Sequence, residues 1–120
     1  MGNPDQFSQP KFDKQEDVYA GVQSLLTAAI TNLSANLGAS PGAKDIFYAG
    51  NNAQWIAAAN TLKARFYLHT REYANAISYA NQGISSAAGD MLAKHGGTYQ
   101  LDMNLYNSFV DQDRGGYLTG

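Results

Sequence analysis

Apolar residues recur at steps of three and four over residues 18–37, and this spacing predicts one amphipathic helix of about six turns. The apolar positions are Val18, Val22, Leu25, Leu26, Ala29, Ile30, Leu33 and Leu37. Asp13 and Glu16 have the spacing of a capping box, so the helix is predicted to begin there. Gly38 is the predicted stop, because glycine readily takes the left-handed conformation that ends helices.

A second helix is predicted from Asn51 to His69, and it is apolar on two faces. At 100° per residue one face carries a set of large residues and the opposite face a set of mostly small ones. The two sets are Trp55, Ala59, Leu62 and Phe66, and Ala53, Ala57, Ala64 and Leu68. Asn51 and Gln54 form a further capping pair. A helix that is apolar on two faces packs between neighbours, so we expect it to be the central one.

A three- to four-residue turn at residues 70–72 leads into a third predicted helix that carries Tyr73, Ala76, Ile77, Ala80 and Ile84. This spacing is similar to that of the second helix of a tetratricopeptide repeat. Ala64 and Tyr67 occupy the matching places on the preceding helix. One such pair does not bury its own faces, since arrays need about three repeats. Residues 18–37 are therefore expected to cover it.

The remaining segments show no helical period. Residues 1–12, with two prolines, are predicted to be an extended lead-in, and residues 44–50 an extended segment before the central helix. From Asp90 onward glycines come in pairs and aromatic residues alternate with amides and acids. We therefore predict an all-α fold: a tetratricopeptide-like helix pair packed on a long N-terminal helix within residues 13–90. Residues 91–120 are predicted to be an irregular C-terminal tail of the same domain, which the chain's end leaves truncated.

Composition narrows the function classes. The chain has 120 residues, enough for one domain, and a net charge of −2, which gives no electrostatic case for nucleic acid or for an anionic membrane surface. The absence of cysteine excludes disulfides, thiolate catalysis and cysteine-type metal sites. No apolar run reaches the roughly 18 residues of a membrane span, and the first residues lack the basic and apolar regions of a signal peptide.

The chain offers little for catalysis or metal binding. His69 and His95 are its two histidines, and neither has a second ligand one helical turn away, so no zinc site is expected. Asp111 and Asp113 lack the later ligands of a calcium loop and are interpreted as a solvated acidic turn. No nucleophile elbow is present. We therefore expect no catalytic residue, no metal and no cofactor.

Aromatic residues in the tail are the candidates for ligand contact. They lie in loop-like sequence, where they can stack on a sugar ring or pack beneath a loop, and both alternatives stay open. These candidates are Tyr99, Tyr106, Phe109 and Tyr117. Trp55 is interpreted as a core residue rather than a sugar platform. Arg65 is expected to be at least half-buried and to tie the loops to the central helix, with Asp45 or an acid of the tail as its partner.

Three motifs in order make the chain resemble a known family. They are Phe12-Asp13-x-Gln15-x-x-Val18-Tyr19, then Asp45-Ile46-Phe47-Tyr48-Ala49-Gly50, then Trp55-Ile56-x-Ala58-Ala59-Asn60-Thr61-Leu62-Lys63-Ala64-Arg65. This order is similar to that of the SusD/RagB family of outer-membrane nutrient-uptake lipoproteins, over about residues 9–90. Asn51 stands where the family usually has Asp, and either residue caps a helix. Asp45, Trp55, Asn60 and Arg65 match the family motif and are expected to be architectural.

The resemblance implies a helical protein held by a lipid anchor on the extracellular face of the outer membrane. There it would cap a SusC-like, TonB-dependent barrel transporter and bind an oligosaccharide or another nutrient without catalysis. The resemblance also implies that the chain is an internal fragment, because the anchor and further helices are absent from it. The alternative is a tetratricopeptide-like protein-interaction module that docks onto the transporter or another partner. An enzyme, the third possibility, would need a pocket with a perturbed acid or histidine.

One structural expectation follows from the fragment interpretation. The two apolar faces of the central helix would be the middle layer of a larger protein. Part of the unit's apolar surface should therefore be exposed, or be covered by another copy of the chain.

Overall fold

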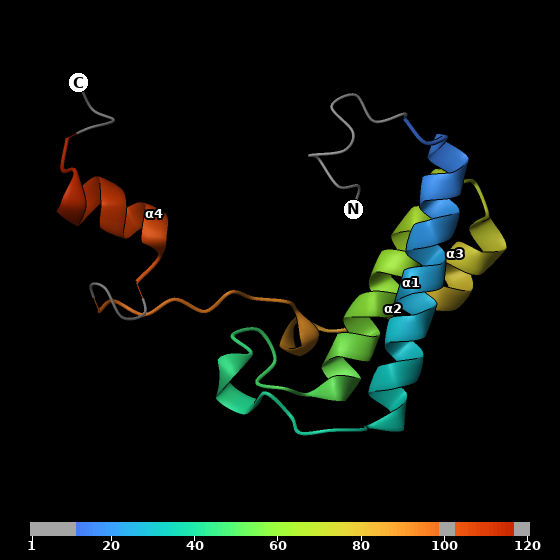
Figure 1. Cartoon of the computed structure of the whole chain (residues 1–120), viewed down its shortest axis with the longest axis horizontal. Coiled ribbons are helices and arrows are strands. Elements are labelled where there is room, and N and C mark those ends of the chain that lie inside the picture. Colours follow the sequence, from blue (N-terminus) through green and yellow to red (C-terminus); the bar gives the residue numbers. More distant parts are fainter. Residues whose placement is uncertain (1–11, 99–102, 117–120) are drawn as a thin grey trace, which may run out of the picture.

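The computed structural model describes residues 12–98 and 103–116, and the regular secondary structure of this part of the chain is entirely helical (Figure 1). The long helices are α1 (Gln15–Ala35) and α2 (Asn52–His69), followed by the shorter α3 (Tyr73–Ala80). α2 packs against α1 on one side and α3 on the other. The described residues form no strand, so the predicted all-α class, with a helix pair packed on a long N-terminal helix, is confirmed. The likeness of α2 and α3 to a tetratricopeptide repeat stays a prediction.

α1 has the predicted length, but both of its ends differ from the prediction. Its N-cap is Lys14, which makes no side-chain capping bond, so the proposed cap at Asp13 is wrong. At the other end Asn36 takes a left-handed conformation, with φ of 51°, and its N–H donates to the carbonyl of Leu33. Asparagine tolerates this conformation better than most residues, and it therefore ends the helix before Gly38 is reached.

The segment before α2 is a series of turns and not the extended stretch that its sequence predicted. A 3-10 helix, Gly42–Lys44, is followed by turns over residues 45–50, in which Ala49 and Gly50 have φ values of 51° and 79°. α2 then begins as predicted, because the side chain of Asn51 accepts a hydrogen bond from the N–H of Gln54 at 3.2 Å.

α3 ends one turn earlier than predicted, and α2 side chains explain why. The hydroxyl of Thr61 accepts the N–H of Ile84 at 2.9 Å, and the amide of Asn60 donates to the carbonyl of Gln82 at 3.3 Å. These bonds hold the chain after Ala80 against α2 and give its backbone partners outside a helix.

The helices meet at a buried lysine. Lys63 of α2 is 2% exposed, and its ammonium donates to the hydroxyl of Thr27 at 2.6 Å and to the carbonyl of Gln23 at 3.3 Å. On the α3 side the ammonium lies 4.6 Å from the ring centroid of Tyr79. Lys63 thus joins all three helices, whereas Arg65, which was expected to be buried, is exposed and does not contact Asp45.

Large apolar side chains stay exposed on the helices, as the sequence predicted. Leu25 of α1 is 71% exposed, and Val18, Leu62, Leu68 and Ile77 are also exposed. Among the described residues the buried apolar side chains are mainly small ones: Ala58, Ala59 and Ala76, together with Tyr48. The described helices therefore have a narrow core of small residues and much uncovered apolar surface.

The predicted irregular tail contains a short helix. Residues 90–98 are exposed and largely without regular structure, as expected. α4 (Leu105–Asn107) follows and continues as a π-helix over Ser108–Asp113. The side chain of Asn104 accepts from the N–H groups of Tyr106 and Asn107, at 3.0 and 3.3 Å, and so starts this helix.

Candidate functional site

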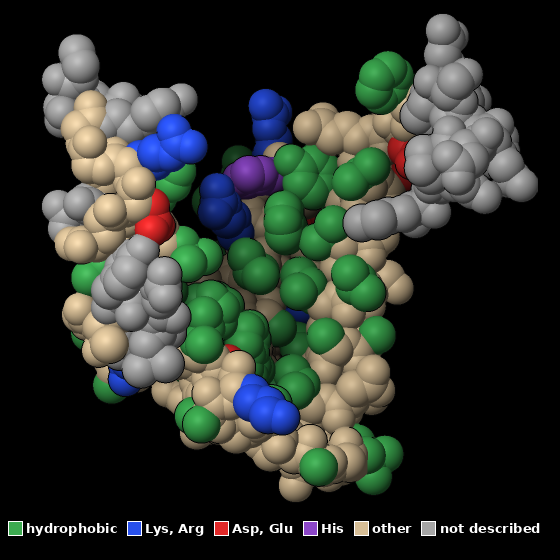
Figure 2. Space-filling view, turned by 60° about the vertical axis from the view of Figure 1, so that its left-hand side comes forward, with side chains coloured by type: hydrophobic (Ala, Val, Ile, Leu, Met, Phe, Trp, Pro, Cys, Tyr) green, Lys and Arg blue, Asp and Glu red, His purple; other side chains and the backbone are tan. Residues whose placement is uncertain are grey.

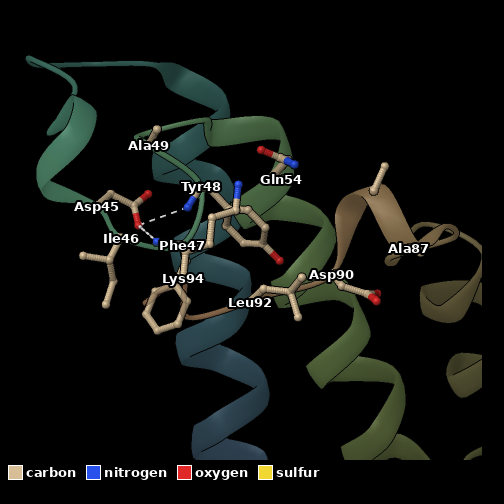
Figure 3. A pocket seen from close by; sticks show the side chains of 11 residues that line it. Asp45, Ile46, Phe47, Tyr48, Ala49, Gln54, Ala87, Asp90, Leu92 and Lys94 are labelled. Atoms are coloured by element: carbon tan, nitrogen blue, oxygen red, sulfur yellow. Dashed lines mark hydrogen bonds between the residues drawn. The ribbon is translucent and has the colours of Figure 1, made fainter. Parts of the chain in front are cut away.

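A hollow of about 450 Å³ lies between the turn before α2 and the segment that follows α3 (Figure 3). Residues 45–49 and Gln54 form one wall, and residues 87–94 form the other. The 3-10 helix Ala87–Gly89 brings that second wall into place. The lining residues are Asp45, Ile46, Phe47, Tyr48, Ala49, Gln54, Ala87, Ala88, Asp90, Leu92 and Lys94.

Asp45 holds the first wall together. Its Oδ1 accepts the backbone N–H groups of Phe47 and Tyr48, at 3.1 and 3.3 Å. Its Oδ2 accepts the N–H of Gly50 at 2.9 Å and the indole N–H of Trp55 at 2.6 Å. Burial alone would raise the pKa of Asp45, but these four donors outweigh it and hold the pKa below its ordinary value. The carboxylate is thus charged and fully occupied, so it serves the loop and not proton transfer.

Aromatic rings fill the space behind this carboxylate. The ring of Tyr48 stands edge-on to Trp55 with centroids 5.2 Å apart, and Phe47 does the same at 6.1 Å. The Tyr48 hydroxyl donates to the carbonyl of Gly89 at 3.0 Å and so joins the two walls. Burial raises the pKa of Tyr48, and the charges of Asp90 and Asp45 raise it further, so the phenol stays a neutral donor.

The open side of the hollow carries groups that can bind a polar ligand. Asp90 and Lys94 are exposed and Gln54 is half-buried, while Ile46 and Leu92 present apolar surface beside them. An acid, an amine and an amide next to apolar carbon suit a ligand with several hydroxyl groups. The chemistry that this arrangement offers is binding.

The structure brings some of the predicted residues together and separates others. Asp45 lines the hollow and accepts the indole N–H of Trp55, and Asn60 is buried where it holds the chain after α3. Arg65 instead lines a shallow apolar groove between α2 and α3 with Leu68 and Ile77. The architectural role of these four motif residues stays a prediction, although the contacts of the first three agree with it.

Of the aromatic candidates of the tail, the two that the structure describes do not line the hollow. Tyr106, which is 68% exposed, and Phe109 lie on the helix that begins at α4. Tyr99 and Tyr117 lie outside the described residues.

Sequence reasoning missed the second wall of the hollow, with Asp90 and Lys94. Tyr48 and Gly89, whose hydrogen bond joins the two walls, are 41 positions apart, and no local sequence pattern predicts this contact. The turn organised by Asp45 did leave a signal: an aspartate whose side chain can bond the backbone just after it, and a glycine five positions on.

Two further properties can be stated for the described residues. Nowhere in ranges 12–98 and 103–116 do three histidine or acidic side chains gather in the way a metal ion requires. Within the same ranges, no helix combines the length and apolar character that crossing a membrane demands.

The described residues thus form a helical scaffold with a polar-rimmed hollow and exposed apolar side chains. The SusD-like family model, described as starch-binding and associating with the outer membrane, matches residues 1–97. The chain belongs to this SusD-like family, as the motif order predicted. Comparison with curated proteins and with solved structures gave no match. The matched range includes α1, α2, α3 and both walls of the hollow, and it ends before α4.

Proposed function

We propose that this chain belongs to a non-catalytic, glycan-binding component of an outer-membrane nutrient-uptake system. The observation that carries the proposal is the match of residues 1–97 to a family described as starch-binding and associating with the outer membrane. In this proposal the protein captures an oligosaccharide and passes it to a SusC-like, TonB-dependent barrel. A lipid anchor outside this cysteine-free chain would hold the protein at the extracellular face.

Two places in the described chain could supply sugar contacts. The first is the hollow, where the hydrogen-bonding groups of Gln54, Asp90 and Lys94 lie beside apolar side chains. The second is Tyr106, whose exposed ring could stack on the apolar face of a sugar. The other tail candidates, Tyr99, Phe109 and Tyr117, belong to this second proposal.

Calorimetric titration of the chain with maltooligosaccharides tests the function and separates the two places. If the hollow binds, a double substitution Asp90→Ala with Lys94→Ala weakens binding at least tenfold and Tyr106→Ala leaves it unchanged. If the tail binds, the two results are exchanged. Lys44→Ala, an exposed change outside the hollow, is the matched control. Absence of heat with every glycan in a broad panel would contradict the proposed function.

A second candidate function, a protein-interaction module, rests on the apolar groove between α2 and α3. This groove of about 280 Å³ is lined by Ala64, Arg65, Leu68, Ala76, Ile77 and Ala80. Its apolar walls suit a helix of the transporter or of another partner. Ile77→Glu should abolish capture of a barrel partner while glycan binding is retained. Capture that survives this substitution would count against the groove as the docking surface.

A further inference from the structure

A second pocket lies where the beginning of α1 meets the end of α2, and its volume is about 490 Å³. Both helices and the turn between α2 and α3 contribute to its lining, which comprises Glu16, Tyr19, Ala20, Gln23, Tyr67, Thr70 and Glu72. We call this space the acidic pocket. None of these residues lines the hollow, so the acidic pocket is a separate candidate site.

The described lining of the acidic pocket carries two carboxylates and no basic side chain. The hollow, in contrast, has Lys94 beside its acids, and the groove between α2 and α3 has Arg65. Figure 2 shows a face of the molecule on which hydrophobic side chains gather over the helices and few acidic side chains are visible. Two acids that border one pocket are therefore a local feature, and a pocket lined by one sign of charge concentrates ligands of the opposite sign.

Glu72 is held in place by neighbouring side chains. Its Oε1 accepts a hydrogen bond from the hydroxyl of Thr70 at 3.0 Å, and its Oε2 accepts one from the amide of Asn75 at 2.9 Å. Both donors are uncharged, so they orient the carboxylate without neutralising it. Glu16 borders the same space from the first turn of α1. A ligand in the pocket therefore has acids from two different elements beside it.

Gln23 adds an acceptor that the described chain leaves without a donor. Its Nε2 donates to the carbonyl of Lys63 at 3.1 Å, and this bond fixes the orientation of the amide. Its Oε1 is buried, and no donor among the described residues bonds to it. A buried acceptor without a partner costs free energy, which a ligand that donates a hydrogen bond would recover. Together with the carboxylates, this oxygen favours a ligand rich in N–H donors.

Two tyrosines give the acidic pocket aromatic walls. The ring of Tyr67 stacks on Tyr79 with centroids 5.4 Å apart, and the ring of Tyr19 lies 5.8 Å from that of Phe66. These contacts hold both tyrosine rings in position. Aromatic faces attract organic cations, and the ammonium of Lys63 already lies 5.8 Å from the centroid of Tyr67.

Two lysines oppose a cationic ligand, and they limit its affinity. Lys63 is buried behind the pocket, where it contacts Tyr67. Lys14 lies 3.7 Å from Glu16, but both side chains of this ion pair are more than three-quarters exposed, at 77% and 76%. Such exposed pairs contribute little to stability, so a ligand can replace Lys14 at small cost. We therefore expect dissociation constants in the millimolar range.

We propose that the acidic pocket binds an organic cation, a ligand in which a primary ammonium group is joined to a sugar-like or apolar body. The ammonium lies beside Glu16 and Glu72, and the body packs against Tyr19 and Tyr67. The proposal does not depend on glycan binding at the hollow. Amino sugars and lysine side chains of proteins carry the same group, and the test distinguishes these two sources.

NMR titration of the chain with three probes tests the proposal. Glucosamine carries the ammonium on a sugar, Nα-acetyl-lysine amide carries it on an amino-acid side chain, and N-acetylglucosamine is the uncharged match of the first. An amine should shift the ring signals of Tyr19 and Tyr67, and its binding should weaken as the salt concentration rises. N-acetylglucosamine should bind at least tenfold more weakly. The amine that binds more tightly identifies the source.

Two double variants locate the site. Glu16→Gln with Glu72→Gln keeps the size of both side chains and should weaken amine binding about tenfold. Asp13→Asn with Asp17→Asn removes the same charge from the same end of α1 but from outside the lining, so this matched control should change binding less than twofold. Circular dichroism shows that each variant keeps its helices. Titration of both variants with maltooligosaccharides tests the hollow separately.

Three results would overturn the proposal. The first is the failure of both amines to shift the signals of Tyr19 and Tyr67. The second is equal binding of N-acetylglucosamine, which would indicate a site for hydroxyl groups regardless of charge. The third is equal weakening in the two double variants, which would indicate general attraction by the acids of this end of the molecule.

Discussion

Lys63 places a positive charge where α1, α2 and α3 meet. In the described part of the chain its partners are uncharged: a hydroxyl, a carbonyl and the face of Tyr79. A buried cation without a carboxylate depends on such dipoles, and a desolvated cation–π contact contributes about 2 kcal/mol. Its four-carbon stem also fills space between the helices, so packing and charge have to be tested separately.

Two substitutions at Lys63 separate these contributions. Lys63→Ala should lower the free energy of unfolding by about 2–5 kcal/mol, because it leaves a cavity between three helices. Lys63→Met keeps the stem and should stay within about 1–2 kcal/mol of the wild type, since it removes a buried charge. Thr27 is not left unpaired, because its hydroxyl also donates to Gln23 at 2.8 Å. Urea denaturation measures both variants, and an equal loss in the two would show that the charge matters more than the packing.

Asp45 should make the turn before α2 sensitive to acid. Its pKa is lowered in the folded chain, so its contribution to stability is present above the unfolded pKa of about 3.9 and is lost as the pH falls through the folded value. Trp55, the one tryptophan of the chain, donates to this carboxylate and reports its state by fluorescence. We expect its emission to change below about pH 4. Asp45→Asn should remove that acid transition, and an unchanged transition would assign it to another group.

The sequence predicted burial of Arg65, whereas the buried cation of α2 is Lys63. Lys63 and Arg65 stand two apart on α2, and periodicity favoured burial of the second, between two apolar faces. The burial of Lys63 is determined by Thr27 and Tyr79, which come from other helices and lie 36 and 16 positions away. Single-helix periodicity contains no information about such partners.

Among the elements, α1 and α2 were predicted within a few residues because their apolar periods are long. The errors fall at their ends and in the connection between them. Asn36 stopped α1 before the expected glycine, and a side-chain carboxylate folded residues 45–50 into turns. Asx turns compete with regular structure through local bonds that a hydrophobic pattern does not show. The first wall of the candidate site was thus partly predictable, and the second wall, brought from residues 87–94 by tertiary contacts, was not.

Two glycine-to-alanine substitutions, one in the turn before α2 and one inside α1, test how strongly the backbone conformation of that turn is constrained. Gly50 has a φ of 79°, and an added Cβ would meet Ser40 Oγ and the backbone nitrogen of Gly42, so Gly50→Ala should cost more than about 1 kcal/mol. Gly21 lies inside α1 with open space around it, so Gly21→Ala should stabilise the chain by about 0.5–1 kcal/mol. Thermal denaturation compares the two. Destabilisation by Gly21→Ala would mean that something covers this side of α1.

The described helices leave many large apolar side chains exposed, among them Leu25 at 71% and Ile77 at 64%. Because the urea dependence of unfolding scales with the surface that unfolding exposes, the monomeric chain should have a slope near the lower end of about 1–3 kcal/mol/M. The measurement is made at a concentration where sedimentation shows monomers. A slope near the upper end of that range would mean that the isolated chain buries its apolar faces in a way that the described helices do not show.

The exposed segment 90–98 allows α1, α2 and α3 to be separated from α4 without any mutation. Because this segment is exposed and contains Lys94, it is a preferred site for limited proteolysis by trypsin. A cut after Lys94 leaves α1, α2 and α3 on one peptide and α4 on the other. Whether the two peptides then separate or stay together on a native gel depends only on non-covalent contacts. Cleavage in this segment thus tests whether α4 stays bound to the other helices once the covalent link between them is cut.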